Sequence, residues 1–286
     1  MTPFLFVGPA VILLACVIVY PMVYGLAMSF TSLDPRLKLS WVGVANFARV
    51  FSNAAFWAAL RQSVYFTVVS VAIHIILGMV IALALNRQSK LVRVVRPLFV
   101  LPWAVAPVIV ATVWAWMYNP SYGIINETLL RVGLLSRPIP WLALPGYAMS
   151  AVIVANIWRG TPFVSLMFLA GLQAIPDEQY EAALVDGANG WHRFWYITVP
   201  NLRHVLLVVV ILDTVWNFKL FDLVKVMTGG GPIGTTEVLP TLIYRTAFEY
   251  GDLGAAAAIA AVMLVLSVLA MYGFLRTFRE LGESVE

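Results

Sequence analysis

Amide, carboxylate and guanidinium side chains lie inside two long apolar stretches of this chain. Asn156 and Arg159 occupy the first, and Asp213 and Asn217 occupy the second, one helical turn apart. Polar groups at membrane depth are costly and usually face a bundle interior or an aqueous cavity. Either Arg159 and Asp213 form a structural ion pair between helices, or all four residues line a passage for a polyhydroxylated solute, because amides and carboxylates hydrogen-bond to hydroxyls.

Neighbouring residues extend this candidate passage. Trp158 and Trp216 are close enough in sequence to stack on a sugar ring. Lys219 and Asp222, three residues apart near the outer end of the second stretch, are expected to pair on one helix face, and we assign both to the passage. His74 lies in the middle of an earlier apolar stretch, where helix packing is its expected role.

The sequence carries no motif typical of an enzyme. Walker-type nucleotide motifs are absent, as are HExxH, CxxC and GxSxG. A Gly-rich segment, TGGGP at 228–232, is not followed by Lys-Ser/Thr, which argues against a phosphate cradle. We therefore expect no catalytic residue, metal site or cofactor in this chain.

The composition is that of an integral membrane protein. Hydrophobic residues make up 62% of the chain and charged residues only 11%, against about a quarter in soluble domains. The single cysteine, Cys16, excludes an internal disulfide. No basic segment precedes the first apolar stretch, so a cleaved signal peptide is not expected. The net charge of +4 bears on membrane orientation more than on nucleic acid.

Six apolar stretches are long enough to cross a bilayer core of about 30 Å. They predict an all-α polytopic membrane protein with one domain over 1–286, and their approximate bounds are 4–30, 63–85, 98–118, 147–172, 205–226 and 255–275. A run of alanines at 255–258 predicts a surface for close helix approach.

Basic residues predict the orientation, because short cytoplasmic loops carry an excess of Lys and Arg. Such residues gather in alternate loops and after the last stretch: Arg87, Lys90, Arg93, Arg96, Arg193, Arg203, Arg276 and Arg279. Both termini and the segment 176–200 are therefore expected in the cytoplasm. The segments 33–61, 119–146 and 227–254 are expected on the opposite side, the first with a short surface helix.

The segment 176–200 between the fourth and fifth stretches predicts two short helices. Pro176 suits a first helical position, and Gly187 suits the left-handed residue that ends a helix. A second amphipathic piece covers 191–199, and Pro200 is expected to break it. Two short helices with an apolar face and no core of their own require a partner that covers them.

The spacing within this segment resembles the EAA loop of binding-protein-dependent ABC importer permeases. Glu181-Ala182-Ala183 is followed by three residues and Gly187, then by nine residues, Ile197, one residue and Val199-Pro200. The family pattern ends in Ile-x-Leu-Pro, so Val199 is a small departure. The outer segments GVANFARVF and FKLFDLVKVMTGGGP are similar to those of the oligosaccharide and glycerol-3-phosphate subgroup, and the similarity covers essentially the whole chain.

The resemblance implies a type I ABC importer permease fold with six membrane helices and a cytoplasmic coupling loop. It implies a second homologous permease, two ATPase subunits that bind ATP and Mg, and an extracytoplasmic solute-binding protein that delivers the sugar. The implied location is the cytoplasmic (inner) membrane of a bacterium or archaeon. The implied coupling positions are Glu181, Ala182, Ala183, Asp186 and Gly187.

Alternatives to this interpretation remain. One is a secondary transporter in which His74, Arg159 and Asp213 relay protons. Another is a membrane-embedded enzyme, which the absence of paired catalytic groups disfavours. Within the permease interpretation, glycerol-3-phosphate or a related phosphodiester would favour cations such as Arg159 and Lys219. If Asp213 and Asp222 neutralise these cations, a neutral sugar is the expected solute.

Overall fold

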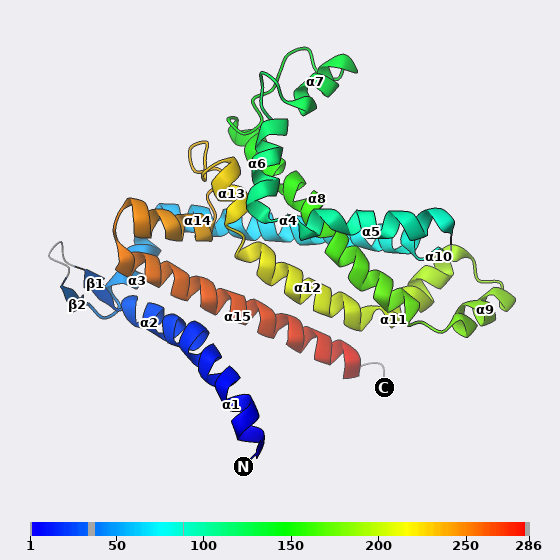
Figure 1. Ribbon diagram of the computed structural model, residues 1–286, viewed down its shortest axis with the longest axis horizontal. Helices are drawn as coiled ribbons and strands as arrows, with labels where there is room; N and C mark the ends of the chain where they lie inside the picture. Colours follow the sequence, from blue (N-terminus) through cyan, green and yellow to red (C-terminus); the bar gives the residue numbers. More distant parts are fainter. Residues whose placement is uncertain (1, 34–37, 88, 284–286) are drawn as a thin grey trace. The chain divides into compact units, whose positions relative to one another are not determined.

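The computed structural model describes residues 2–33, 38–87 and 89–283, and these are mostly helical (Figure 1). One two-stranded antiparallel sheet is the only sheet in the described part of the chain. The chain divides into two compact units, each treated by itself. Unit 1 comprises Met1–Arg61 and Glu237–Leu269, and unit 2 comprises Gln62–Thr236 and Ala270–Glu286.

Five helical segments of the described chain are long and apolar enough to cross a membrane, or up to six if one bent pair of helices counts as a single span. They overlap all six predicted apolar stretches, and the candidate spans are Val7–Met28, Ala54–Leu85, Pro145–Gln173, Arg203–Met227 and Leu253–Arg276, with the bent pair Lys90–Ala104 and Pro107–Met117. The second span begins earlier than expected, because the helix continues into the predicted outer segment.

Unit 1 begins with a helix whose described side chains, from Val7 onward, are mostly exposed. In its most apolar window within Val7–Met28, 0% of the residues are buried, so its apolar side chains face outward. Its consecutive parts are α1 (Thr2–Leu14), η1 (Ala15–Val19) and α2 (Tyr20–Met28), followed by the hairpin strands β1 (Thr31–Leu33) and β2 (Leu39–Trp41). The strands pair in antiparallel register, with Thr31 opposite Trp41 and Leu33 opposite Leu39.

Close packing in unit 1 depends on small residues at the start of α15 (Leu253–Glu283). A Cβ atom at Gly254 would come within 2.3 Å of the Thr31 carbonyl oxygen and 2.8 Å of Asn46 Nδ2. Asn46, on α3 (Ala45–Ser52), is buried and donates to the carbonyls of Ser29 and Thr31 at 2.9 and 2.7 Å. Helix α3 confirms the short helix predicted in the first outer segment. The buried alanines that follow Gly254 form the predicted small-residue surface.

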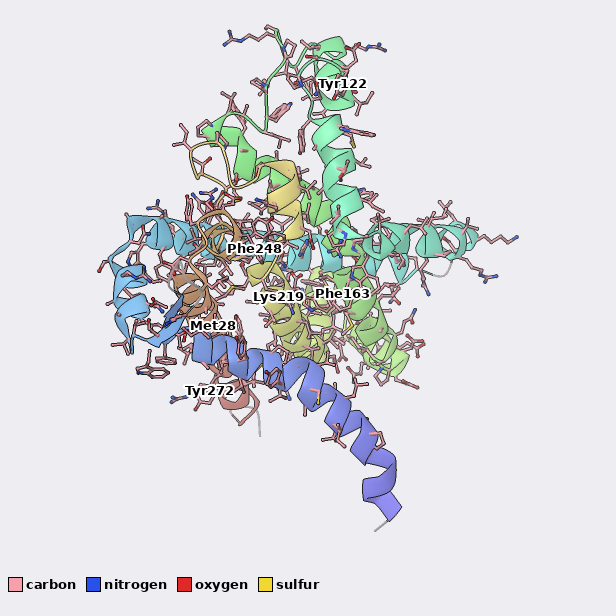
Figure 2. All side chains as sticks on the ribbon, turned by 60° about the vertical axis from the view of Figure 1, so that its left-hand side comes forward. Met28, Tyr122, Phe163, Lys219, Phe248 and Tyr272 are labelled. Atoms are coloured by element: carbon pink, nitrogen blue, oxygen red, sulfur yellow. The ribbon has the colours of Figure 1, made fainter. Side chains whose placement is uncertain are left out.

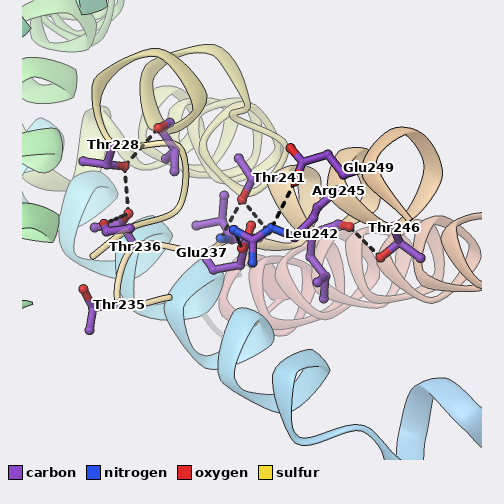
Figure 3. Close-up of polar contacts among 12 residues, drawn as sticks. Thr228, Thr235, Thr236, Glu237, Thr241, Leu242, Arg245, Thr246 and Glu249 are labelled. Carbon is purple, nitrogen blue, oxygen red and sulfur yellow. Dashed lines mark hydrogen bonds and ion pairs between the residues drawn. The ribbon is translucent and has the colours of Figure 1, made fainter. Parts of the chain in front are cut away.

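A polar cluster in unit 1 connects the helical segments α14 (Leu239–Tyr244) and η3 (Arg245–Glu249) to the chain before them. Arg245 Nη2 forms an ion pair with the buried Glu237 carboxylate, and Arg245 Nε lies 3.8 Å from Glu249 Oε2 (Figure 3). The Thr241 hydroxyl accepts from the Val238 N–H at 3.0 Å and donates to the Val238 carbonyl at 2.9 Å.

Unit 2 contains most of the polar residues of interest. Its elements are the main part of α4 (Ala54–Leu85), α5 (Lys90–Ala104), α6 (Pro107–Met117), α7 (Ile124–Arg131), α8 (Pro145–Gln173), α9 (Asp177–Val185), α10 (Gly190–Arg193), η2 (Phe194–Thr198), α11 (Val199–Asn201), α12 (Arg203–Phe218) and α13 (Asp222–Met227). In Figure 1, α8 lies beside α12 and α5, and an apolar core that includes Phe168, Leu172, Leu202 and Val209 joins these helices.

The third predicted stretch, 98–118, is not one straight helix. Helices α5 and α6 meet at an angle of 95°. Val105 and Ala106 between them are extended, with ψ of 135° and 136°. Pro107 explains the break, because a proline disfavours the helical conformation of the residue before it.

The fifth predicted stretch, 205–226, is likewise divided. Helix α12 ends at Phe218, and α13 starts at Asp222. The Gly-rich segment after α13 makes a tight turn, in which Gly229 and Gly230 have φ of +61° and +89°. The Thr228 and Thr236 hydroxyls, 2.7 Å apart, close this turn (Figure 3).

The segment 176–200 forms the predicted helix pair with two differences. Pro176 is the N-cap of α9 and not its first helical residue, since its ψ of 134° is extended. Pro200 does not break the second helix, which continues through α11 to Asn201. The wide π-type turn of η2, in which the Val199 N–H bonds to the Phe194 carbonyl, accommodates the proline that an α-helical turn would exclude.

Candidate functional site

A buried chain of hydrogen bonds crosses three helices of unit 2. Asn156 Nδ2 on α8 donates to Asn217 Oδ1 on α12 at 2.6 Å. Asn217 Nδ2 donates to Asp213 Oδ1 at 2.8 Å, one turn earlier on the same helix. Asp213 Oδ2 lies 2.8 Å from His74 Nδ1 on α4. All four side chains are buried, and three of the four were predicted to lie together.

For His74 the sequence favoured helix packing and gave a polar role only in the proton-relay alternative, whereas the structure shows both packing and polar contacts. Its Nδ1 meets the Asp213 carboxylate, and its Nε2 lies 3.3 Å from the Asn156 carbonyl oxygen. A Cβ atom at Gly160 would come within 2.4 Å of the imidazole, so the glycine of α8 makes room for it. His74 therefore packs against α8, as predicted, and also takes part in the polar chain. The signal was available, since a buried histidine requires hydrogen-bond partners and Asp213 is a nearby acceptor at membrane depth.

The predicted ion pairs are not formed. In the described part of the chain no ion pair joins Arg159 to Asp213, whose carboxylate is used by His74 and Asn217. Arg159 instead interacts electrostatically with Asp222, and its Nε is buried without a hydrogen-bond partner among the described groups. Nor does an ion pair join Lys219 to Asp222 within those residues, because Lys219 lies after the end of α12 and the two do not share a helix.

The polar chain borders a small cavity. Arg159, Asn156, Asp213, Asn217 and His74 all line it. The space open to water inside is about 30 Å³, which is enough for one or two water molecules and too little for a sugar ring. The cavity in this structure is therefore too small for the solute that the sequence suggested.

Aromatic rings complete the wall of this cavity. Trp216 lies 4.8 Å from Phe163 between ring centroids, and Phe163 stacks on Trp103 at 5.4 Å. Figure 2 shows Phe163 on α8 and Lys219 at the end of the neighbouring α12. Trp216 lines the cavity beside Asn217, whereas Trp158 contacts Trp114 and is not among the lining residues. Trp103 was missed because it precedes the break between α5 and α6.

The segment 176–200 presents a turn of fixed geometry. Helix α9 ends at Val185 with Asp186 as its C-cap, and Gly187 follows with φ of +78°. The Gly187 N–H donates to the Leu184 carbonyl at 3.1 Å, and the Ala188 N–H donates to the Ala183 carbonyl at 2.8 Å. These two bonds make a Schellman motif, which needs a left-handed residue. The predicted helix stop at Gly187 is confirmed.

The turn is anchored at its base and exposed at its tip. The Tyr180 and Thr198 hydroxyls lie 2.9 Å apart, and Asn201 Nδ2 donates to Gln179 Oε1 at 3.0 Å. Tyr180 also packs on the apolar core of unit 2. These contacts tie α9 to η2 and α11.

Four of the five predicted coupling residues are exposed at this tip, and Ala183 is half-buried; the exposed ones are Glu181, Ala182, Asp186 and Gly187. A Cβ atom at Gly187 would meet nothing within 4 Å. Large apolar side chains are exposed as well, with Val185 at 88% and Tyr196 at 77%. An exposed apolar surface on a structured loop is typical of a protein interaction site.

Comparison with known protein families gives one match over most of the chain. Residues 74–278 match the family described as "Binding-protein-dependent transport system inner membrane component". The matched region contains the polar chain, the cavity and the loop around Gly187.

Individual relatives are similar over nearly the whole length. The trehalose/maltose transport system permease protein MalF of Thermococcus litoralis is 43% identical over 241 residues, covering 84% of this chain and 81% of the relative. The sulfoquinovosyl glycerol transport system permease protein SmoG of Agrobacterium fabrum is 35% identical over 277 residues, covering 96% and 89%. The inner membrane ABC transporter permease protein YcjO of Escherichia coli is 35% identical over 265 residues, covering 92% and 89%.

A solved structure shares the fold. A chain in the crystal structure of a bacterial ABC transporter involved in the import of the acidic polysaccharide alginate superposes with a TM-score of 0.86. The alignment covers 98% of this chain and 95% of that one at 24% sequence identity.

Proposed function

Because the chain belongs to the family of binding-protein-dependent transport system inner membrane components, we propose that it is the pore-forming permease subunit of an ATP-driven ABC importer for a di- or oligosaccharide. The sugar follows from the named cargo of its relatives, trehalose/maltose and sulfoquinovosyl glycerol. The chain is a transport subunit and not an enzyme, and the hydrolysis of ATP with Mg belongs to its partner.

The observation that carries this proposal is the exposed Schellman turn at Gly187, in the segment whose spacing resembles the EAA loop. We propose that α9 and this turn dock into a cleft of the ATPase subunit. Small side chains at Ala182 and Ala183 permit close approach, and Glu181 is free to pair with a basic residue of the ATPase. Closure of the ATPases then moves α12 through the contacts of Tyr180 and Gln179.

The remaining partners follow from the same family. A second homologous permease forms the other half of the pore, and an extracytoplasmic solute-binding protein delivers the sugar. A solved alginate importer structure is a complex with a periplasmic protein bound to alginate pentasaccharide, which supports the latter. We place the chain in the cytoplasmic (inner) membrane of a bacterium or archaeon, with both termini in the cytoplasm.

The solute passage includes the small cavity of unit 2. When its helices separate, the amides of Asn156 and Asn217 become available to sugar hydroxyls, and Trp216 provides an apolar ring face. Arg159 Nε supplies an additional donor. Lys219 and Asp222 lie toward the outer end. A phosphorylated solute such as glycerol-3-phosphate is the second candidate, favoured by Arg159 and Lys219, which form no ion pair in the described chain.

Replacing Asn217 with Ala is expected to lower sugar-stimulated uptake about tenfold, because it leaves the Asn156 amide and Asp213 Oδ1 without their partner, at a cost of about 1–3 kcal/mol. The assembled complex should remain intact on size exclusion. Asn126→Ala is the control, since Asn126 is also a buried amide but bonds to the Ile139 backbone and Trp141. Unchanged uptake kinetics for Asn217→Ala would remove this residue from the passage.

Reconstitution tests the proposed function as a whole. The complete importer in proteoliposomes is expected to take up labelled trehalose or maltose only with its binding protein and ATP, and a protonophore should leave uptake unchanged. The alternative, a secondary transporter with a relay through His74, Asp213 and Arg159, requires the opposite result. Uptake that persists without the ATPase but stops with the protonophore would reject our proposal.

A further inference from the structure

A basic groove lies between the first turns of α5 and the end of α8 in unit 2. Its volume is about 650 Å³. Four basic side chains line it: Arg87, Lys90, Arg93 and Arg96. The lining also includes one carboxylate, that of Asp177. The groove therefore carries an excess of positive charge.

The four basic side chains of the groove outnumber the one carboxylate in its lining. No ion pair joins any of the four to a carboxylate among the described residues. Arg96 Nη2 donates to the Leu85 carbonyl at 2.8 Å, which fixes the guanidinium at the end of α4, while its Nε is buried without a hydrogen-bond partner in the same set of residues. The amino end of α5, capped by Ser89, adds the positive end of a helix dipole. The groove therefore suits an anion with several acceptor oxygens.

The surroundings of the groove indicate which anion. One face of α5 beside it exposes apolar side chains at spacings of three and four residues: Leu91, Val94, Leu98 and Leu101. A helix with a basic side and an exposed apolar side is typical of the membrane interface. A phospholipid offers a phosphate to the basic side and acyl chains to the apolar side at once, whereas a free phosphate offers only the first.

We propose that this groove binds the headgroup phosphate of an anionic phospholipid at the membrane surface. Gln173 and Ile175 at the end of α8, together with Asp177 at the start of α9, form its opposite wall. A bound headgroup thus bridges α5 and the root of the coupling loop. Basic residues in cytoplasmic loops set orientation in any case. Orientation requires only their charge, whereas the groove requires that the four side chains converge.

The test compares two variants of the assembled importer in nanodiscs of phosphatidylcholine with a minor fraction of phosphatidylglycerol. In the first, Arg87→Gln, Lys90→Gln and Arg93→Gln remove three charges. In the second, Arg87→Lys, Lys90→Arg and Arg93→Lys keep them, which controls for membrane orientation. Native mass spectrometry counts the retained phosphatidylglycerol, a readout that does not depend on transport or on the proposed sugar.

The charge-removing variant is expected to lose retained phosphatidylglycerol by about fivefold per charge, whereas the charge-keeping variant should retain most of it. ATPase stimulation by the binding protein should rise with phosphatidylglycerol in the natural protein and not in the charge-removing variant. Equal lipid retention by natural and charge-removing proteins would overturn the proposal. Full stimulation of the ATPase by inorganic phosphate in neutral nanodiscs would also overturn it, because the groove would then bind a soluble anion. Loss of the ATPase subunit from the charge-removing variant, without any change in retained lipid, would overturn it too, because the groove would then be a protein contact.

Discussion

The substitution Gly187→Asp is expected to leave the protein inserted in the membrane while ATP-driven uptake falls at least tenfold. Gly187 has φ of +78° in the Schellman motif at the exposed tip of the proposed coupling loop, so a side chain there strains the turn and projects outward. A buried unpaired carboxylate in a docking cleft costs several kcal/mol, and about 1.4 kcal/mol is already a factor of ten in binding.

The chain offers a matched control for this experiment. Gly133 follows α7 with φ of +75°, and a Cβ atom there would also meet nothing within 4 Å. Gly133→Asp imposes the same backbone strain outside the coupling loop, so it should leave uptake and co-purification of the ATPase unchanged. If Gly187→Asp behaved like Gly133→Asp in both measurements, the coupling role of the turn would be wrong.

A companion substitution tests charge alone. Glu181→Lys should also uncouple uptake, and the introduction of an acidic residue at the facing basic position of the ATPase should restore it. Exposed ion pairs contribute only about 0–1 kcal/mol, so the loss expected from Glu181→Lys comes mainly from like-charge repulsion in the cleft.

The second large effect is expected at the centre of the polar chain. Asp213→Leu removes the carboxylate that accepts from Asn217 and meets His74, so His74 Nδ1 loses its partner and Asn217 Nδ2 keeps only the Asp213 backbone carbonyl. Leaving a buried polar group without its hydrogen-bond partner costs about 1–3 kcal/mol. The thermal midpoint of the purified permease should fall by several degrees, and uptake should be lost.

Asp213→Asn separates stability from transport. The amide keeps the shape and retains an acceptor for Asn217, so most of the thermal stability should return. Uptake should remain lower than in the natural protein if the carboxylate takes part in opening the passage. A thermal midpoint for Asp213→Leu equal to that of the natural protein would show that the hydrogen-bonded chain does not stabilise the fold.

The regular features of this protein could be predicted from the sequence because each depends on local chemistry. Long apolar stretches predict helices, and a glycine after an amphipathic turn predicts the helix stop at Gly187. The breaks could not be located this way: Pro102 is inside α5, whereas Pro107 ends the extended link between α5 and α6. Whether a helix continues through a proline, as it does through Pro200 with the help of a wide turn, depends on whether the preceding backbone carbonyls leave room for the ring.

The polar site was predicted in part for a related reason. Spacing places Asp213 and Asn217 on one face of α12 without any tertiary information, and the structure agrees. Hydrogen-bond partners on other helices depend on the depth of each helix in the membrane and on its rotation about its own axis, and the sequence determines neither. Arg159 and Asp213 do line one cavity, but Oδ2 of the Asp213 carboxylate meets Nδ1 of His74, from a helix much earlier in the chain.

The wide turn Phe194–Thr198 also makes the length of the loop critical. Each residue of an α-helix advances it by about 100° and 1.5 Å. Deleting one residue here would rotate the segment before it by about that amount, and the hydroxyls of Tyr180 and Thr198 would no longer meet. The number of residues between the tip and α12 therefore sets the direction in which the loop points, in addition to the side chains that the tip presents.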